Sequence, residues 1–134
     1  MNLPKLSFDN FESILKYIFE LSKTKKVILV LDEYAYLKKT IMGIDSILQS
    51  LIDSYKDDSK MSLILLGSYV DIMKNILNSS NPLYGRVDLT LNLKPMDYYD
   101  SSLFYQTFSN EDKIKLYSVF GGIPYYNKLI DERK

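Results

Sequence analysis

The chain has 134 residues, a length that suits one domain with a core of its own. Basic and acidic residues number 17 each, so the charge gives no reason to expect nucleic acid or an anionic membrane as a partner. The absence of cysteine and histidine excludes disulfides and the commonest metal ligands and general base. No apolar run approaches the roughly 20 residues of a membrane span, and residues 1–7 lack a signal-peptide core, so we expect a soluble, cytoplasmic chain.

The N-terminal part of the sequence predicts an amphipathic helix followed by a buried strand. Ser7 is a candidate N-cap, and apolar residues recur at roughly helical spacing over 8–21. A strand is predicted over 27–32, because its first five residues are continuously apolar, a pattern typical of a strand buried on both faces. The strand ends at two adjacent carboxylates, Asp32 and Glu33.

The middle of the sequence predicts a second helix, a second strand and a third helix. The helices cover 44–55 and 70–77, and a polar loop over 56–60 precedes the strand. That strand is short and apolar, over 63–67, and Ser68 follows it directly. The third helix ends in the turn-forming residues 78–82.

Residues 87–94 alternate strictly between apolar and polar side chains, which indicates a strand at a sheet edge with one buried and one wet face. After Pro95 the chain is predicted to be helical, with Asp97 and Ser109 as N-caps and a break at Gly121–Gly122. The order of these elements predicts an α/β fold with a thin, three-stranded parallel sheet and a helical C-terminal annex.

Asp32 and Glu33 are the first candidates for chemistry, because ligands of open parallel sheets sit just beyond the carboxyl ends of the strands. One carboxylate there can hold Mg²⁺ while its neighbour orients or deprotonates a water. Acidic residues also commonly cap the turn after a strand, so function is only one interpretation. Ser68 would lie beside Asp32 if the two strands are neighbours, and it is equally suited to cap the following helix.

Arg86 is the only arginine before Arg133, and arginine is suited to bidentate contact with phosphate. A surface ion pair is the more common use of such a residue. Pro124 is a routine choice for the first turn of a helix. The 12 tyrosines are expected to be half-buried packing residues rather than stacking platforms.

Taken in order, these pieces resemble the predominantly archaeal ATPase family within the AAA+/STAND P-loop NTPases. The resemblance covers about 6–130 and is carried by Val-Leu-Asp-Glu-Tyr at 30–34, Pro-Leu-Tyr-Gly-Arg at 82–86 and Gly-Gly-Ile-Pro-Tyr-Tyr at 121–126. It implies that residues 1–95 are the α/β core of a P-loop NTPase. Residues 96–134 would then be a helical extension and the start of a lid.

The resemblance also implies roles for single residues. Asp32 matches the Walker B carboxylate that organises Mg²⁺, and Glu33 matches the residue that polarises the attacking water. Ser68 falls at the sensor-1 position, which reads the γ-phosphate. Arg86 falls where these ATPases carry an arginine finger or its equivalent.

Gly122 and Pro124 match the lid motif that packs near the nucleotide. The large departure from the family is the phosphate cradle, since no Gly-x-x-x-x-Gly-Lys-Ser/Thr sequence occurs in the chain. The chain therefore resembles the C-terminal two-thirds of an ATPase core. Each lost charge-assisted contact is worth roughly 1.5–3 kcal/mol. Mg²⁺ and ATP thus belong to the parent domain, and we expect this chain alone to bind ATP poorly or not at all and to be inactive.

Two alternatives stay open. One is a metal-dependent hydrolase or nuclease using Asp32 and Glu33, with Asp53 as a further candidate. The other is an α/β interaction module without chemistry. In the ATPase interpretation, the missing P-loop strand leaves a gap between the strands at 63–67 and 87–93. Because unpaired edges are templates for pairing, we expect self-association through an exposed sheet edge or helical face.

Overall fold

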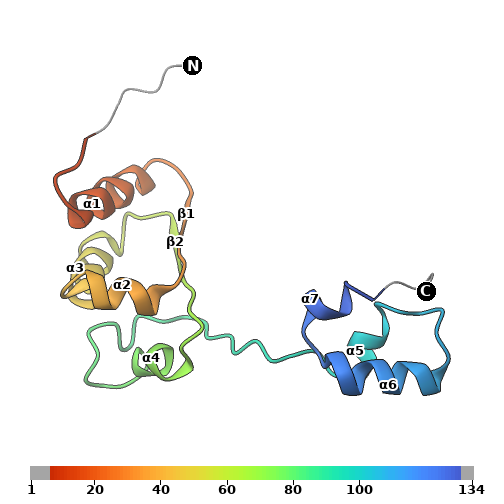
Figure 1. Cartoon of the computed structure of the whole chain (residues 1–134). Coiled ribbons are helices and arrows are strands. Elements are labelled where there is room, and N and C mark those ends of the chain that lie inside the picture. Colours follow the sequence, from red (N-terminus) through yellow and green to blue (C-terminus); the bar gives the residue numbers. More distant parts are fainter. Residues whose placement is uncertain (1–6, 131–134) are drawn as a thin grey trace. The chain divides into compact units, whose positions relative to one another are not determined.

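The structure is a computed structural model that describes residues 7–130, and Figure 1 shows its helices and strands along the chain. The described chain divides into two compact units, one reaching to Leu89 and one beginning at Thr90. Nowhere in residues 7–130 does a helix combine the length and apolar character needed to cross a bilayer. In order, the elements are α1 (Phe11–Ser22), β1 (Val27–Leu31), α2 (Tyr34–Thr40), α3 (Ile44–Tyr55), β2 (Met61–Leu65), α4 (Val70–Asn75), α5 (Tyr98–Ser102), α6 (Asn110–Phe120) and α7 (Pro124–Asn127).

Helix α1 begins later than the sequence analysis expects. Asn10, and not Ser7, is its N-cap, because the Asn10 side chain accepts a hydrogen bond from the Ser13 amide at 2.8 Å. The Ser13 hydroxyl accepts in return from the Asn10 amide at 3.4 Å, which completes a capping box. Two orphan amides are satisfied in this way, so the helix starts where a reciprocal cap is available.

Strands β1 and β2 pair in parallel, with Val27 opposite Met61 and Leu31 opposite Leu65, which confirms the predicted pairing. Alternate side chains point to opposite faces. One face packs on helices, whereas the other leaves Ile28 and Val30 63% and 46% exposed and Ile64 41% exposed. Burial on both faces is therefore a wrong expectation for the described chain, because a continuous apolar run shows what a strand can bury and not what covers it.

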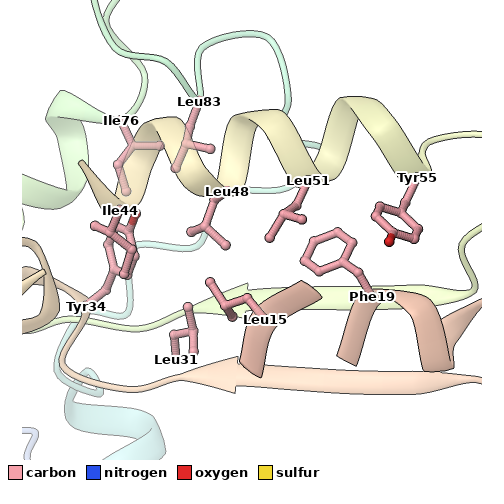
Figure 2. Packing of buried hydrophobic residues seen from close by; sticks show 10 residues of the cluster. All are labelled: Leu15, Phe19, Leu31, Tyr34, Ile44, Leu48, Leu51, Tyr55, Ile76 and Leu83. Atoms are coloured by element: carbon pink, nitrogen blue, oxygen red, sulfur yellow. The ribbon is translucent and has the colours of Figure 1, made fainter. Parts of the chain in front are cut away.

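Helices α1 and α3 supply most of the core on the covered face of the sheet. Figure 2 shows Leu15 and Phe19 of α1 pointing toward Leu48 and Leu51 of α3, above the two strands. Phe19 and Tyr55 also meet with ring centroids 5.6 Å apart. The full cluster comprises Leu15, Phe19, Leu31, Tyr34, Ile44, Leu48, Leu51, Tyr55, Ile76 and Leu83. These contacts hold the carboxyl end of β1 at a fixed place beside β2.

The predicted third strand is not formed. Residues 87–94 are irregular chain, so the described sheet has two strands and not three. Leu89, Leu91 and Leu93 are 72%, 73% and 90% exposed. Alternation of apolar and polar residues indicates only a capacity to form a strand, and a strand exists only when a neighbour supplies its hydrogen bonds. Within residues 7–130, β1 and β2 pair only with each other.

The second unit contains α5, α6 and α7, as the helical prediction after Pro95 requires. Its predicted caps are confirmed: the Asp97 side chain accepts from the Asp100 amide at 2.9 Å, and the Ser109 hydroxyl accepts from the Asp112 amide at 3.2 Å. Helix α6 ends at Gly121, whose φ of 61° is readily adopted only by glycine. The short local signals of this region were therefore sufficient to place its helices.

Candidate functional site

The carboxyl end of β1 turns sharply at Glu33. This residue has φ 48° and ψ 46°, and it is the only non-glycine residue with positive φ among residues 7–130. The turn lets the Tyr34 amide donate to the Leu66 carbonyl at 2.8 Å, so α2 starts directly beside the end of β2. A left-handed non-glycine residue costs free energy and is held only when its surroundings require it, and such residues cluster at functional sites.

Ser68 lies at the same edge of the sheet as the two carboxylates. Its hydroxyl donates a long hydrogen bond of 3.4 Å to Glu33 Oε2, whereas Asp32 Oδ1 accepts from the Glu33 amide at 2.8 Å. The carboxylate in contact with Ser68 is thus Glu33, although the sequence analysis expected Asp32. The capping alternative for Ser68 is wrong, because the N-cap of α4 is Tyr69 and it makes no side-chain capping bond.

The donors at this edge suit a hard divalent cation. Asp32, Glu33 and Ser68 are all exposed and offer only oxygen atoms. Mg²⁺ is commonly held by one or two carboxylates together with phosphate oxygens and water, so the pair fits that ion. Across the described part of the chain, no three Asp, Glu, His or Cys residues gather closely enough to hold a metal by themselves. The alternative that adds Asp53 to the ligand set therefore gains no support.

Arg86 is held elsewhere, by Asp53 near the end of α3. Its Nε and Nη2 donate to the two Asp53 carboxylate oxygens at 2.7 and 2.6 Å. Its Nη1 donates to the carbonyls of Pro82 and Tyr84 at 3.0 and 3.1 Å. The hydrogen bond from Arg86 lowers the pKa of the Asp53 carboxyl and raises that of Arg86 itself. The common alternative, an ion pair, is what the structure contains, and it fastens the 82–86 turn to α3.

A buried carboxylate that sequence reasoning missed lies at the start of α3. Asp45 is 9% exposed and accepts from the Tyr34 hydroxyl at 2.5 Å, from Lys38 Nζ at 2.6 Å and from Asn81 Nδ2 at 2.8 Å. Burial alone would raise the pKa of Asp45, but these three donors outweigh it and hold the pKa below its ordinary value. Burial, together with the bond to Asp45, raises the pKa of Tyr34.

The Asp45 network positions the candidate edge from behind. Tyr34 follows Glu33 directly, so its hydroxyl fixes the first turn of α2 against α3. Asp53 lies eight residues after Asp45, or roughly 12 Å along the helix axis, so Arg86 is bound toward the other end of α3. A signal existed in the sequence: Asp45 stands next to Ile44 and three residues before Leu48, on a helix face that is otherwise apolar.

Gly122 and Pro124 have structural roles within the second unit. A Cβ on Gly122 would lie 1.9 Å from the Met96 carbonyl oxygen, so only glycine fits. The Met96 amide donates to the Gly122 carbonyl at 2.8 Å across this close approach. Pro124 occupies the first turn of α7, where its missing N–H costs nothing. Their expected place near a nucleotide stays a prediction.

The family model of ATPase domains found predominantly in Archaea matches residues 2–130. The chain belongs to this family. The match covers both units, from before α1 to beyond α7, and therefore includes residues 30–34, 82–86 and 121–126.

Two relatives of this archaeal ATPase domain match parts of the chain. The uncharacterized protein MJECL04 of Methanocaldococcus jannaschii is 32% identical over 103 residues, which is 76% of this chain and 24% of that protein. The uncharacterized protein MJ0424 of the same organism is 36% identical over 55 residues, 41% of this chain and 53% of that protein. The chain thus spans about a quarter and about half of these two relatives.

A solved structure agrees on the fold. The Walker-type ATPase PABY2304 of Pyrococcus abyssi superposes with a TM-score of 0.64 at 21% identity, covering 95% of this chain and 41% of that one. At this identity the likeness concerns the fold alone. The domain is therefore an α/β structure with a small parallel sheet and flanking helices, similar to a P-loop ATPase.

Proposed function

We propose that this chain carries the carboxylate half of an ATP-hydrolysing site of the AAA+/STAND kind. One observation supports it most directly. The parallel pairing of β1 and β2 brings Glu33 and Ser68 within 3.4 Å of each other at the carboxyl edge of the sheet, with Asp32 adjacent in the turn. Open α/β sheets bind their ligands at such edges.

Each residue at this edge has a proposed task. Asp32 is the Walker B carboxylate and the ligand of Mg²⁺, an ion that would neutralise developing charge on the phosphates when bound. Glu33 orients the attacking water, and its contact with Ser68 sets the direction in which its carboxylate points. Ser68, at the sensor-1 position, offers its hydroxyl to the γ-phosphate. These tasks need the oxygen donors that the edge presents, and none needs histidine or cysteine.

The other half of the site has to come from outside these 134 residues. The sequence contains no Gly-rich loop ending in Lys-Ser/Thr. Lys38 is committed to Asp45, and Lys39 Nζ lies 5.1 Å from the centre of the Tyr69 ring. We therefore assign the phosphate cradle to a Walker A segment beyond this chain, and the chain alone is inactive in this proposal.

The remaining family positions are proposed to act with that completed site. Arg86 would serve as an arginine finger only after it exchanges Asp53 for a phosphate, since Asp53 now takes two of its donors. Gly122 and Pro124, in the lid that follows the 1–95 core, would pack near the nucleotide. The close approach of Gly122 to the Met96 backbone, directly before α7, is compatible with a rigid lid motif.

The metal role of Asp32 can be tested on the chain as it exists, with Mn²⁺ as a paramagnetic substitute for Mg²⁺. In amide NMR spectra, we expect residues 32–34 and 66–68 to broaden at lower Mn²⁺ concentrations than residues 56–59. Asp57 and Asp58 provide the internal control, because they too are adjacent, exposed carboxylates in a turn. A D32N variant should abolish the selective broadening. Equal broadening at both carboxylate pairs would overturn the proposed metal role.

A further inference from the structure

The interior of the second compact unit is polar. Among residues 90–130, the buried ones are Ser101, Tyr105, Gly122 and Asn127, and the three with a side chain are each 0% exposed. Ser101 Oγ, Tyr105 OH and Asn127 Oδ1 have no hydrogen-bond partner among the described residues. A buried polar atom without a partner carries a desolvation penalty, and native proteins pair nearly all such atoms. Three of them in one small unit indicate a bound group that pairs them.

Asn127 is fixed beside the start of α5. Its Nδ2 donates to the Gly121 carbonyl at 3.0 Å and to the Ile123 carbonyl at 3.3 Å, so Oδ1 is the unpaired arm of its amide. The loop that it holds lies against Met96, whose amide donates to the Gly122 carbonyl at 2.8 Å. Met96 stands directly before the N-cap of α5, so this loop joins Asn127 to the beginning of that helix.

Ser101 and Tyr105 reach the interior from α5 and the turns that follow it. The Ser101 amide donates to the Asp97 carbonyl at 3.0 Å, which places Ser101 one turn from the start of the helix. Tyr105 comes four positions later, where its amide donates to the Ser102 carbonyl at 3.3 Å and the chain continues to turn. Residues at this spacing lie on the same side of a helix, in agreement with the complete burial of both side chains.

Tyr105 also lies near the loop that Asn127 holds. Burial raises the pKa of the Tyr105 hydroxyl, and the hydroxyls of Tyr98 and Tyr117 raise it further, so these three groups are close enough to interact. The Tyr98 and Tyr117 rings meet edge to face, with centroids 5.8 Å apart. The Tyr117 hydroxyl donates to the Met96 carbonyl at 3.3 Å. Because the 121–123 loop packs on Met96, the three unpaired atoms converge on one interior.

We propose that Ser101, Tyr105 and Asn127 together bind one internal water molecule. The Ser101 and Tyr105 hydroxyls donate to the water oxygen, and the water donates to Asn127 Oδ1. Buried waters make about three hydrogen bonds and occur about once per 27 residues, so one water suits a unit that spans 90–134.

The neutral character of the three side chains selects water over an ion. No charged side chain is buried among residues 90–130, so an ion would have no counter-charge in this interior. The water joins α5 to α7 and to the 121–123 loop. The site lies wholly within the second unit, and it depends neither on the proposed Mg²⁺ site nor on residues outside this chain.

A crystal structure of the chain gives the direct test. We expect one ordered water within about 2.7–3.2 Å of Ser101 Oγ, Tyr105 OH and Asn127 Oδ1. Direct hydrogen bonds among these side chains in place of the water would overturn the proposal. The same holds for a protein side chain in that place, or for an interior without ordered density.

Amide hydrogen exchange in solution separates a bound water from an unpaired hydroxyl by the sign of the effect. Tyr105→Phe removes one hydrogen bond of the water, so the protection factors of amides in α5, α6 and α7 should fall about fivefold. If the hydroxyl were unpaired, the same variant would remove a desolvation penalty. Protection that rises or stays unchanged would therefore overturn the proposal. Tyr125→Phe is the matched control, because Tyr125 is 70% exposed, and it should leave protection unchanged.

A double variant tests whether the two hydroxyls share one water. Ser101→Ala and Tyr105→Phe each weaken its binding, so the second substitution should cost less once the first is present. The loss of protection in the double variant should then be smaller than the product of the two single losses. Losses that multiply would show two independent partners and would overturn the shared site.

Discussion

Two groups of carboxylates in the α/β unit are handled in opposite ways. Asp45 is buried and receives hydrogen bonds from three side chains, two of them on α2 and one in the turn after α4. Asp32 and Glu33 are exposed at the end of β1, where Asp32 accepts a local hydrogen bond from the next amide and Glu33 accepts a long one from Ser68. A carboxylate whose oxygens are saturated by the fold stabilises the fold. A carboxylate whose oxygens face solvent at a strand end is available to a ligand.

Removing each carboxylate in turn is the most direct test of this difference, and it has the largest expected effect. Asp45→Ala should lower the free energy of unfolding by about 3–5 kcal/mol, because it leaves the buried Tyr34 hydroxyl and the half-buried Lys38 ammonium without their acceptor. Asp32→Ala, the matched control, should change it by no more than about 0.5 kcal/mol. Urea unfolding followed by circular dichroism measures both. Equal losses in the two variants would show that the two groups are not handled differently.

Acid titration sharpens the same contrast. The pKa of Asp45 in the folded chain lies below its ordinary value of 3.8, so the stability that its charged form contributes is fully present above pH 3.8. The contribution is lost as pH falls through the lower pKa of the folded state. The free energy of unfolding should therefore fall on acidification below pH 3.8, and more steeply in wild type than in Asp45→Asn. Identical slopes in urea unfolding curves collected across this range would contradict the assignment.

A smaller effect of opposite sign is expected at Glu33. Replacement by glycine relieves a left-handed conformation, so Glu33→Gly should raise the free energy of unfolding by about 0.5–1 kcal/mol. The matched control is Asp32→Gly, which should be destabilising because Asp32 has no such conformation to relieve. Thermal unfolding of the two variants measures the difference. Loss of stability in Glu33→Gly would mean that the carboxylate contributes more than the backbone strain costs.

The smallest expected effect is no effect. A ligand present at 100 times its dissociation constant adds about 2.7 kcal/mol, which would raise the melting temperature of a domain this size by roughly 10 °C. We expect Mg-ATP to produce no appreciable rise with this chain alone, because the phosphate cradle is absent from its sequence. Differential scanning fluorimetry against increasing Mg-ATP is the measurement. A saturable rise would show that the exposed edge binds nucleotide without a Walker A segment.

The caps at Asp97 and Ser109 were predicted because their side chains bond within a single turn. The parallel pair β1–β2 was predicted although its residues are distant in sequence, because both strands are short apolar runs and consecutive strands are commonly neighbours. The edge carrying Glu33 and Ser68 was predicted for the same reason, since each follows its strand directly.

What the sequence did not predict depends on partners distant in the chain. Residues 87–94 have a strand pattern without a strand, because no local signal states whether a pairing neighbour exists. The Asp45 network joins residues from α2, α3 and the turn after α4, and pattern reading treated Asp45 as an ordinary helix residue. The Arg86–Asp53 ion pair likewise spans 33 positions. Hydrophobic periodicity shows which face of a helix or strand is apolar, but it does not show which distant polar group contacts that helix or strand.

The close approach of Gly122 to Met96 has a mechanical consequence. The hydrogen bond between their backbones ties the start of the second unit to the residues just before α7, across α5 and α6. A force applied along residues 87–95 therefore reaches α7 by this short route, without first passing through the intervening helices. The hydrogen bond between Met96 and Gly122 thus closes the helical unit at its base. A pull on residues 87–95 would be transmitted through it to Ile123 and Pro124, and a side chain at 122 would break this contact.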